Sequence, residues 1–171
     1  GATVGVHLFI VGCYMSPLVG AALSDGRYGR FATILSLGAV NWCGGALLAL
    51  AAAARSVAAA VLALALMALG TGGIKPCVAA FGADQIDARA PNAAATTTRF
   101  FSVFYFAINV GALASSVATP ALRARCGYVV AFAVPAALMA GALATAAAGR
   151  ARYRHARPEG DALARVARAA R

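Results

Sequence analysis

The run SVAAAVLALALMALGTGGI (residues 56–74) contains no charged side chain and is long enough to cross a lipid bilayer as a helix. Four further uncharged stretches lie at 1–24, 31–54, 100–122 and 126–149. The whole chain is 62% hydrophobic and only 12% charged, with a mean hydropathy of +0.79. A soluble domain of 171 residues cannot bury five such runs in its core. The sequence therefore predicts an all-α, polytopic transmembrane helical bundle.

Five spans are expected, joined by short polar connections, and a basic segment follows the last one. Arg55 and Ser56 form a tight hairpin, whereas 82–98 reads as a longer, turn-rich loop. Gly111, Ser115 and Thr119 recur every four residues, a pattern typical of close helix packing in lipid. The predicted spans are about 4–24, 31–54, 57–81, 100–120 and 128–149, with Pro135 kinking the last, and the linker at 150–171 is either an amphipathic helix or disordered.

Positive charge is distributed unequally between the two predicted sides. Seven of the fifteen basic residues lie between Arg150 and Arg171, which places the linker and the loop at 82–98 in the cytosol and Cys126 outside. The chain opens at Gly1 inside an apolar run, so we expect it to be an internal piece whose parent has one more span before residue 1. The four cysteines show no CxxC spacing, and neither disulfides nor metal ligation are expected.

Lys75 is the most informative single residue, because a cation within a span costs about 2.5–3.5 kcal/mol. All five acidic residues lie outside the predicted spans, so none is placed beside it. Two interpretations remain open: Lys75 lines a polar cavity, or its long stem reaches the headgroups six residues further along the span. Pro76 and the glycines in GTGGIKP (residues 70–76) favour the cavity, since they are expected to loosen the helix.

Other polar residues are placed within spans. His7 lies in the outer third of the first span, where an imidazole can carry a proton near physiological pH or simply hydrogen-bond between helices. Tyr14 is two turns further along the same helix face. Tyr105 and Asn109 are one turn apart and can line a polar stripe, although an interfacial aromatic and a packing amide explain them nearly as well.

Two long motifs resemble the signatures of the proton-coupled oligopeptide transporter family, within the major facilitator superfamily. They are SPLVGAALSDGRYGR (residues 16–30) and GTGGIKPCVAAFGADQID (residues 70–87), the latter followed by RFFSVFYFAINVGAL at 99–113. HLFIVGCYMSP at 7–17 and the stretch at 119–139 look most like animal di- and tripeptide carriers. The resemblance implies proton coupling at His7, peptide binding at Tyr14, Lys75, Tyr105 and Asn109, and a cytosolic gating motif at Asp25, Gly29, Arg30 and Pro76.

The resemblance implies the second to sixth of about twelve helices of a plasma-membrane symporter that imports di- and tripeptides by alternating access. Its partners would be the peptide, the bilayer, and the absent first helix and C-terminal half; protons would couple transport, with no other cofactor, no nucleic acid and no enzymatic step. The family's E-x-x-E-R/K helix is absent, and Val6 stands where animal carriers commonly have tyrosine. The alternatives are a carrier of another substrate, such as nitrate or an amino acid, and a truncated, non-transporting membrane scaffold.

Overall fold

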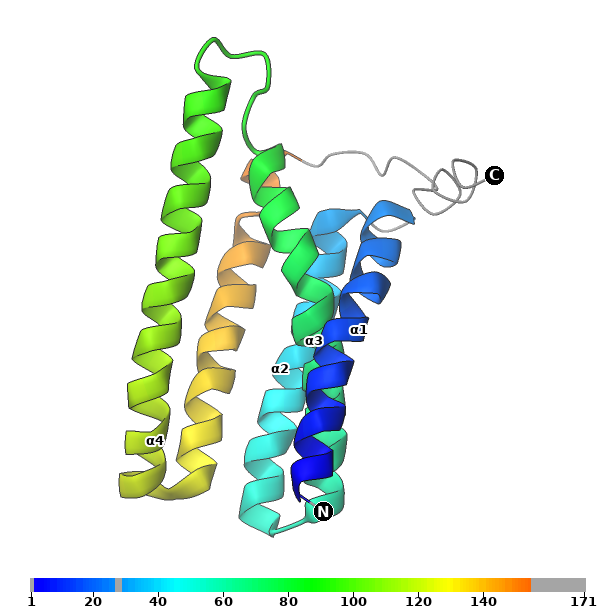
Figure 1. Cartoon of the computed structure of the whole chain (residues 1–171), viewed down its shortest axis with the longest axis vertical. Coiled ribbons are helices and arrows are strands. Elements are labelled where there is room, and N and C mark those ends of the chain that lie inside the picture. The colour runs from blue at the N-terminus through cyan, green and yellow to red at the C-terminus, as the bar shows by residue number, and fades with distance from the viewer. Residues whose placement is uncertain (1, 27–28, 155–171) are drawn as a thin grey trace.

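A computed structural model describes residues 2–26 and 29–154, and within these ranges the chain is helical, with no strand. The predicted linker beyond residue 154 lies outside the described residues. Figure 1 shows the helices running side by side along the long axis of the molecule. They are α1 (Ala2–Gly26), α2 (Arg30–Ala54), α3 (Val57–Asp84) and α4 (Ala93–Ala148), followed by a 3-10 turn at Arg150–Arg152.

Helix α4 consists of two antiparallel limbs that meet at Gly127. This residue has φ 82° and ψ 179°, a conformation that a residue with a Cβ rarely adopts, and it is the non-helical residue within α4. Figure 1 shows the chain reversing direction there. The expected break between the fourth and fifth spans therefore lies at Gly127, and the helix continues through Pro135.

Three described helices are long and apolar enough to cross a membrane by length and composition: α2, α3 and the doubled α4. Between α2 and α3, Arg55 closes the hairpin in the left-handed region with φ 51°. Ser56 then caps α3, because its hydroxyl accepts the amide of Ala59 at 3.3 Å. This two-residue connection holds α2 and α3 as antiparallel neighbours.

The core is built around α3, which packs most extensively against α2 and next against α1, while α2 also packs against α4. The contacts of α2 with α4 involve the second limb, residues 128–148. A Cβ added at Gly38 would meet Met139 at 3.5 Å, and one added at Gly45 would meet Ala136 at 3.3 Å. Small residues thus bring helix backbones close together, as lipid-embedded bundles require.

The glycines before Lys75 pack against other helices. A Cβ at Gly72 would overlap the Ser16 hydroxyl and lie 2.6 Å from the carbonyl oxygen of Cys13 in α1. A Cβ at Gly70 would lie 2.7 Å from the amide nitrogen of Asn41 in α2. Helix α3 continues through Pro76 to Asp84, and the glycines of this turn bring α1 and α2 close to its backbone.

The loop predicted at 82–98 is shorter than expected. Helix α3 extends to Asp84 and α4 already begins at Ala93, which leaves residues 85–92 between them. Thr97 and Thr98, which lie within the predicted loop, are helical in the structure. Their hydroxyls donate to carbonyls of the preceding turn at 2.9 and 3.0 Å. We call the end of the bundle that carries residues 85–92 the loop end.

The first limb of α4, residues 93–126, makes few contacts with the rest of the described chain. Its side chains at Phe106, Leu113 and Val117 are exposed. No atom outside the helix lies within 4 Å of a Cβ added at Gly111. The small-residue stripe predicted to pack closely therefore has no packing partner within the described residues.

Candidate functional site

Lys75 lies in the middle of the bundle on α3, and its side chain is exposed. Gly73 and Cys77, two residues away on either side, are buried, so Lys75 lies on the opposite side of the helix. No hydrogen bond or ion pair connects it to another residue in the part of the chain that the structure describes. The helix continues for nine residues from Lys75 to Asp84, about 13 Å along its axis.

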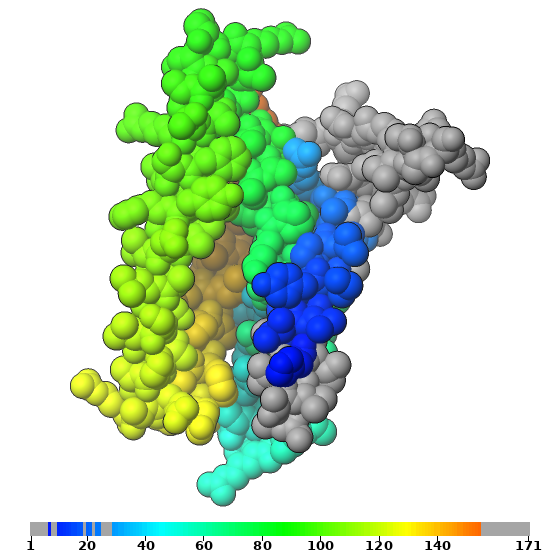
Figure 2. All heavy atoms as spheres, viewed as in Figure 1, coloured from blue at the N-terminus to red at the C-terminus, as the bar shows by residue number. Residues whose placement is uncertain are grey.

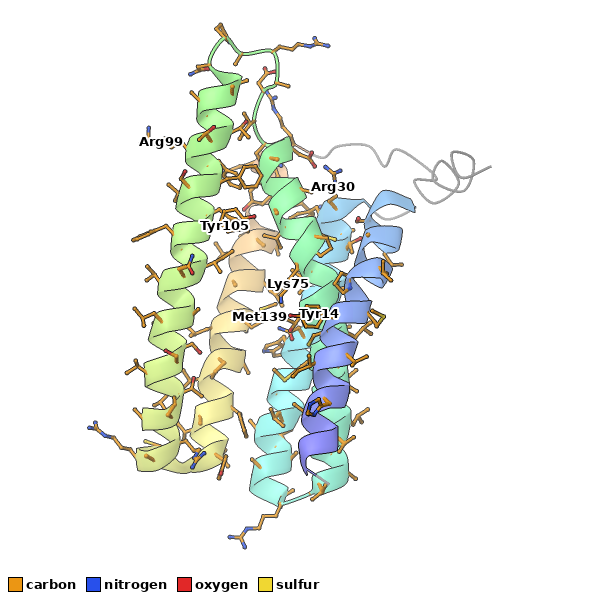
Figure 3. All side chains as sticks on the ribbon, viewed as in Figure 1. Tyr14, Arg30, Lys75, Arg99, Tyr105 and Met139 are labelled. Carbon is orange, nitrogen blue, oxygen red and sulfur yellow. The ribbon has the colours of Figure 1, made fainter. Side chains whose placement is uncertain are left out.

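The face of the molecule next to Lys75 is hollowed. Figure 2 shows the second limb of α4 set back between the first limb and α3. Figure 3 shows Lys75 on the side of α3 nearest this hollow. An exposed cation at this depth of an apolar helix requires a wet or polar surrounding, since a lipid environment would penalise the charge.

Tyr14 and His7 are on α1, which packs against α3. Tyr14 is 75% exposed, and Figure 3 shows it at nearly the same level of the bundle as Lys75. His7 is also exposed, two helical turns closer to the end that carries Arg55. The structure therefore places Tyr14, and not His7, at the level of the lysine.

Tyr105 and Asn109 are on the first limb of α4, away from α1. Tyr105 is 58% exposed, and Figure 3 shows it closer to the loop end than Lys75. Its ring stacks on Phe101 with ring centroids 6.3 Å apart. The Asn109 amide donates to the Tyr105 carbonyl at 2.7 Å, which fixes its orientation on its own helix and leaves its carbonyl oxygen as an acceptor.

The predicted site residues are thus exposed on two separate walls, one formed by α1 and α3 and one by the first limb of α4. No described hydrogen bond joins one wall to the other at these residues. Such an arrangement presents a cation, two phenols and an amide. These groups can bind a ligand that carries a carboxylate and peptide groups.

Three of the four residues of the predicted gating motif lie around the turn between α1 and α2, whereas Pro76 lies within α3. Gly29 has φ 76° and ψ 160°, which favours glycine, and its carbonyl accepts the Thr33 amide and hydroxyl at 3.1 and 2.9 Å. Arg30 begins α2 and binds both carboxylate oxygens of Asp84, at 2.6 and 2.7 Å. The backbone of Asp25 is in the last turn of α1, and its side chain lies outside the description.

Sequence reasoning missed Asp84 as a partner of Arg30. It treated Asp84 as a loop residue, whereas Asp84 ends α3 beside the start of α2. The acid and the arginine are 54 residues apart, so no local spacing reveals the pair. The ion pair is partly exposed, and it links the beginning of α2 to the end of α3 at the loop end.

An aromatic cluster at the same end was also missed. Phe31 of α2, Phe81 of α3 and Tyr153 meet with ring centroids 5.4–5.7 Å apart. Phe31 is buried. The only sequence signal for this cluster is that each aromatic residue stands within a few residues of a helix end.

Comparison with known proteins identifies a family with a similar sequence and fold. Residues 31–171 match the sequence profile of the POT family. The chain is 40% identical over 188 residues to solute carrier family 15 member 1 of Rattus norvegicus, covering 96% of this chain and 26% of that protein. It is 44% identical over 172 residues to solute carrier family 15 member 2 of the same organism, covering 94% and 23%. The chain therefore spans about a quarter of the length of these relatives.

Solved structures agree with the fold. The in meso crystal structure of the POT family transporter PepTSo superposes with a TM-score of 0.85 at 38% identity, covering 92% of this chain and 30% of that one. An auto-inhibited POT family peptide transporter gives 0.83 at 35% identity, covering 90% and 29%. The helices, their connections and the profile match together show that the chain belongs to the POT family, a family of membrane transporters.

Proposed function

We propose that this chain forms part of the N-terminal helical half of a proton-coupled carrier that imports di- and tripeptides by alternating access. The structures that it resembles include two described as peptide transporters. The observation that carries the proposal is Lys75, a cation in the middle of an apolar helix, exposed beside a hollow and without a partner among the described residues.

Lys75 attracts the carboxylate of the peptide. A charge-assisted hydrogen bond between an ammonium and a carboxylate is about twice as strong as a neutral one. Tyr14, at the same level on α1, contacts the peptide from the same wall, while Tyr105 and Asn109 contact it from the first limb of α4. Peptide binding thus supplies the negative charge that the described helices do not place beside the lysine.

Protons are the coupling ion, and His7 is the carrier on this chain. Its place on α1 is toward the end that the charge distribution assigns to the outside. The opposite, cytosolic gate is held by two features. They are the turn at Asp25, Gly29 and Arg30, and the ion pair between Arg30 and Asp84. The carrier needs no other cofactor, performs no enzymatic step and resides in the plasma membrane.

The test compares a dipeptide with its C-terminally amidated analogue in the full-length carrier. The parent is expected to prefer the free carboxylate. The Lys75→Gln variant should insert normally and lose about 1.5–3 kcal/mol of dipeptide binding, a factor of about 10–150, while binding of the amide changes little. Affinity and surface expression are measured together for both proteins.

A variant that keeps the full preference for the carboxylate, at normal expression, would contradict the role given to Lys75. It would leave the lysine as a residue that extends toward the headgroups. Tyr153→Phe serves as the matched control, because it removes one polar group from the loop end, away from the hollow, and should leave both affinities unchanged.

A further inference from the structure

The chain after α4 is docked onto the loop end of the bundle. The 3-10 turn at Arg150–Arg152 is closed by the Arg152 amide, which donates to the Gly149 carbonyl at 2.9 Å. Of the two residues that follow, Tyr153 contacts α2 and α3, and Arg154 contacts Gln85, the first residue after α3. The predicted linker therefore does not leave the bundle directly from its last helix.

Gln85, immediately after α3, binds the backbone of Arg154 twice. Its side-chain oxygen accepts the Arg154 amide at 2.9 Å, and its side-chain nitrogen donates to the Arg154 carbonyl at 3.1 Å. The same nitrogen also donates to the Phe81 carbonyl at 3.2 Å, which ties the Gln85 side chain to the last turn of α3. A primary amide that pairs with both the donor and the acceptor of one residue fixes the position and direction of that backbone.

Tyr153 is held by rings from two helices. Its ring centroid lies 5.7 Å from that of Phe31 in α2 and 5.4 Å from that of Phe81 in α3, the latter edge to face. Such arrangements are favourable for aromatic pairs beyond the apolar area that they bury. A third contact, between Arg154 and Asp87 at 3.8 Å, is exposed on both sides and adds little.

We infer that Tyr153 and Arg154 form a strap, seated on Gln85, Phe31 and Phe81, which fastens the connection after α4 to the rigid body of α2 and α3. Phe81 and Gln85, on which the strap is seated, lie near the end of the motif at 70–87, and Asp84, which lies between them in the sequence, holds α2 through Arg30. The strap gives a structural role to residues 81–85 (FGADQ), a part of the motif that has no role in the proposed substrate site.

The strap has a consequence for the transport cycle, which rests on the proposed function. All of its partners belong to the same half of the carrier, so the strap stays seated while the halves move relative to each other. Residues 150–154 therefore move together with this half and do not act as slack between the halves. As extended chain these five residues would span about 17 Å.

Hydrogen exchange at the Arg154 amide tests the strap in the full-length carrier. We expect this amide to be protected in the parent and to exchange about three to ten times faster in Gln85→Leu, the factor expected for loss of one hydrogen bond. Asn92→Leu is the matched control. Asn92 is an exposed amide at the far end of the same loop, its side chain makes no capping bond, and exchange at Arg154 should not change.

Tyr153→Ala provides a second route that leaves every helix intact, and it should also accelerate exchange at Arg154. An Arg154 amide that exchanges at the unprotected rate in the parent would overturn the strap. So would unchanged exchange in both Tyr153→Ala and Gln85→Leu. These results need no substrate, so they are independent of whether the carrier transports peptides.

Adding a saturating dipeptide tests the persistence of the strap. Protection at Arg154 should be the same with and without the peptide, because the seat lies within one half of the bundle. Loss of protection on peptide binding would contradict a permanently seated strap. Absence of any peptide binding, with Arg154 still protected, would contradict the proposed function and leave the strap in place.

Discussion

The three-helix cluster of α1, α2 and α3 and the first limb of α4 have similarly apolar sequences but are packed very differently. In the most apolar part of α2 and of α3, 28% of the residues are buried, whereas no residue of the first limb, 93–126, is buried. The length of the uncharged run alone does not separate them, since the first limb contains the run 100–122 and α2 the run 31–54. The difference lies in where small residues meet another backbone.

In the cluster, glycine and serine stand where helices cross. Gly20 of α1 faces the backbone of Gly73, and the Ser16 hydroxyl donates to the Ala68 carbonyl at 2.9 Å. The first limb of α4 has the same residue types at Gly111 and Ser115, yet they meet no other helix of the described chain. The same small residues therefore contribute to helix packing in the cluster but not in the first limb. Substitutions at these positions can measure the difference as a change in the free energy of unfolding.

The largest expected effect is the difference in stability loss between valine substitutions at two glycines that both lie inside helices. Gly72→Val places a side chain against Ser16 and the Cys13 carbonyl of α1, and backbone atoms cannot yield cheaply. We expect a loss of about 3 kcal/mol or more, with poor yield of folded protein. Gly111→Val has open space and should change stability by less than about 1 kcal/mol.

Thermal unfolding of the 171-residue chain in detergent, followed by exposure of the buried Cys77 thiol, measures both variants. Equal destabilisation by the two substitutions would show that the first limb packs as tightly as the cluster. That result would remove the distinction between the two regions.

A smaller effect is expected from two serines. Ser16 is only 5% exposed, and Ser16→Ala removes its hydrogen bond to Ala68 at a cost of about 1 kcal/mol. Ser115 is exposed, and its contact with Thr119 is long, at 3.4 Å, so Ser115→Ala should cost less than about 0.5 kcal/mol. The same unfolding assay applies, and a larger loss at Ser115 than at Ser16 would contradict the assignment of the packed face.

The fold was largely predictable because a bilayer-length helix needs little more than about 20 apolar residues. Uncharged runs anticipated where the helices lie, and the tight hairpin at Arg55 and Ser56 was confirmed. The break between the fourth and fifth spans was expected between residues 120 and 128, and the chain reverses there at Gly127, whose φ of 82° favours glycine.

The site was predictable in part. Lys75 is conspicuous as a charge among apolar residues, and its exposure on α3 could be expected from that cost. The partners of Arg30 and Gln85 could not be found in the same way. Asp84 is 54 residues from Arg30, and Arg154 is 69 residues from Gln85, and both pairs exist only because several helix ends meet at the loop end.

The central claim is that Lys75 faces water and the carboxylate of a peptide. It is the only lysine among the 171 residues, so its amine can be labelled in the unmodified sequence and quantified on one proteolytic fragment. The measurement is the rate of reductive methylation of Lys75 in the full-length carrier, with a dipeptide or its C-terminally amidated analogue. The two ligands have the same amine and consume reagent equally, which makes the analogue the matched control.

At a dipeptide concentration ten times its Kd, the rate should fall about tenfold, because only about one site in eleven stays free. The analogue at the same concentration should have little effect. Equal protection by both ligands, or a Lys75 amine that no water-soluble reagent reaches, would contradict the account.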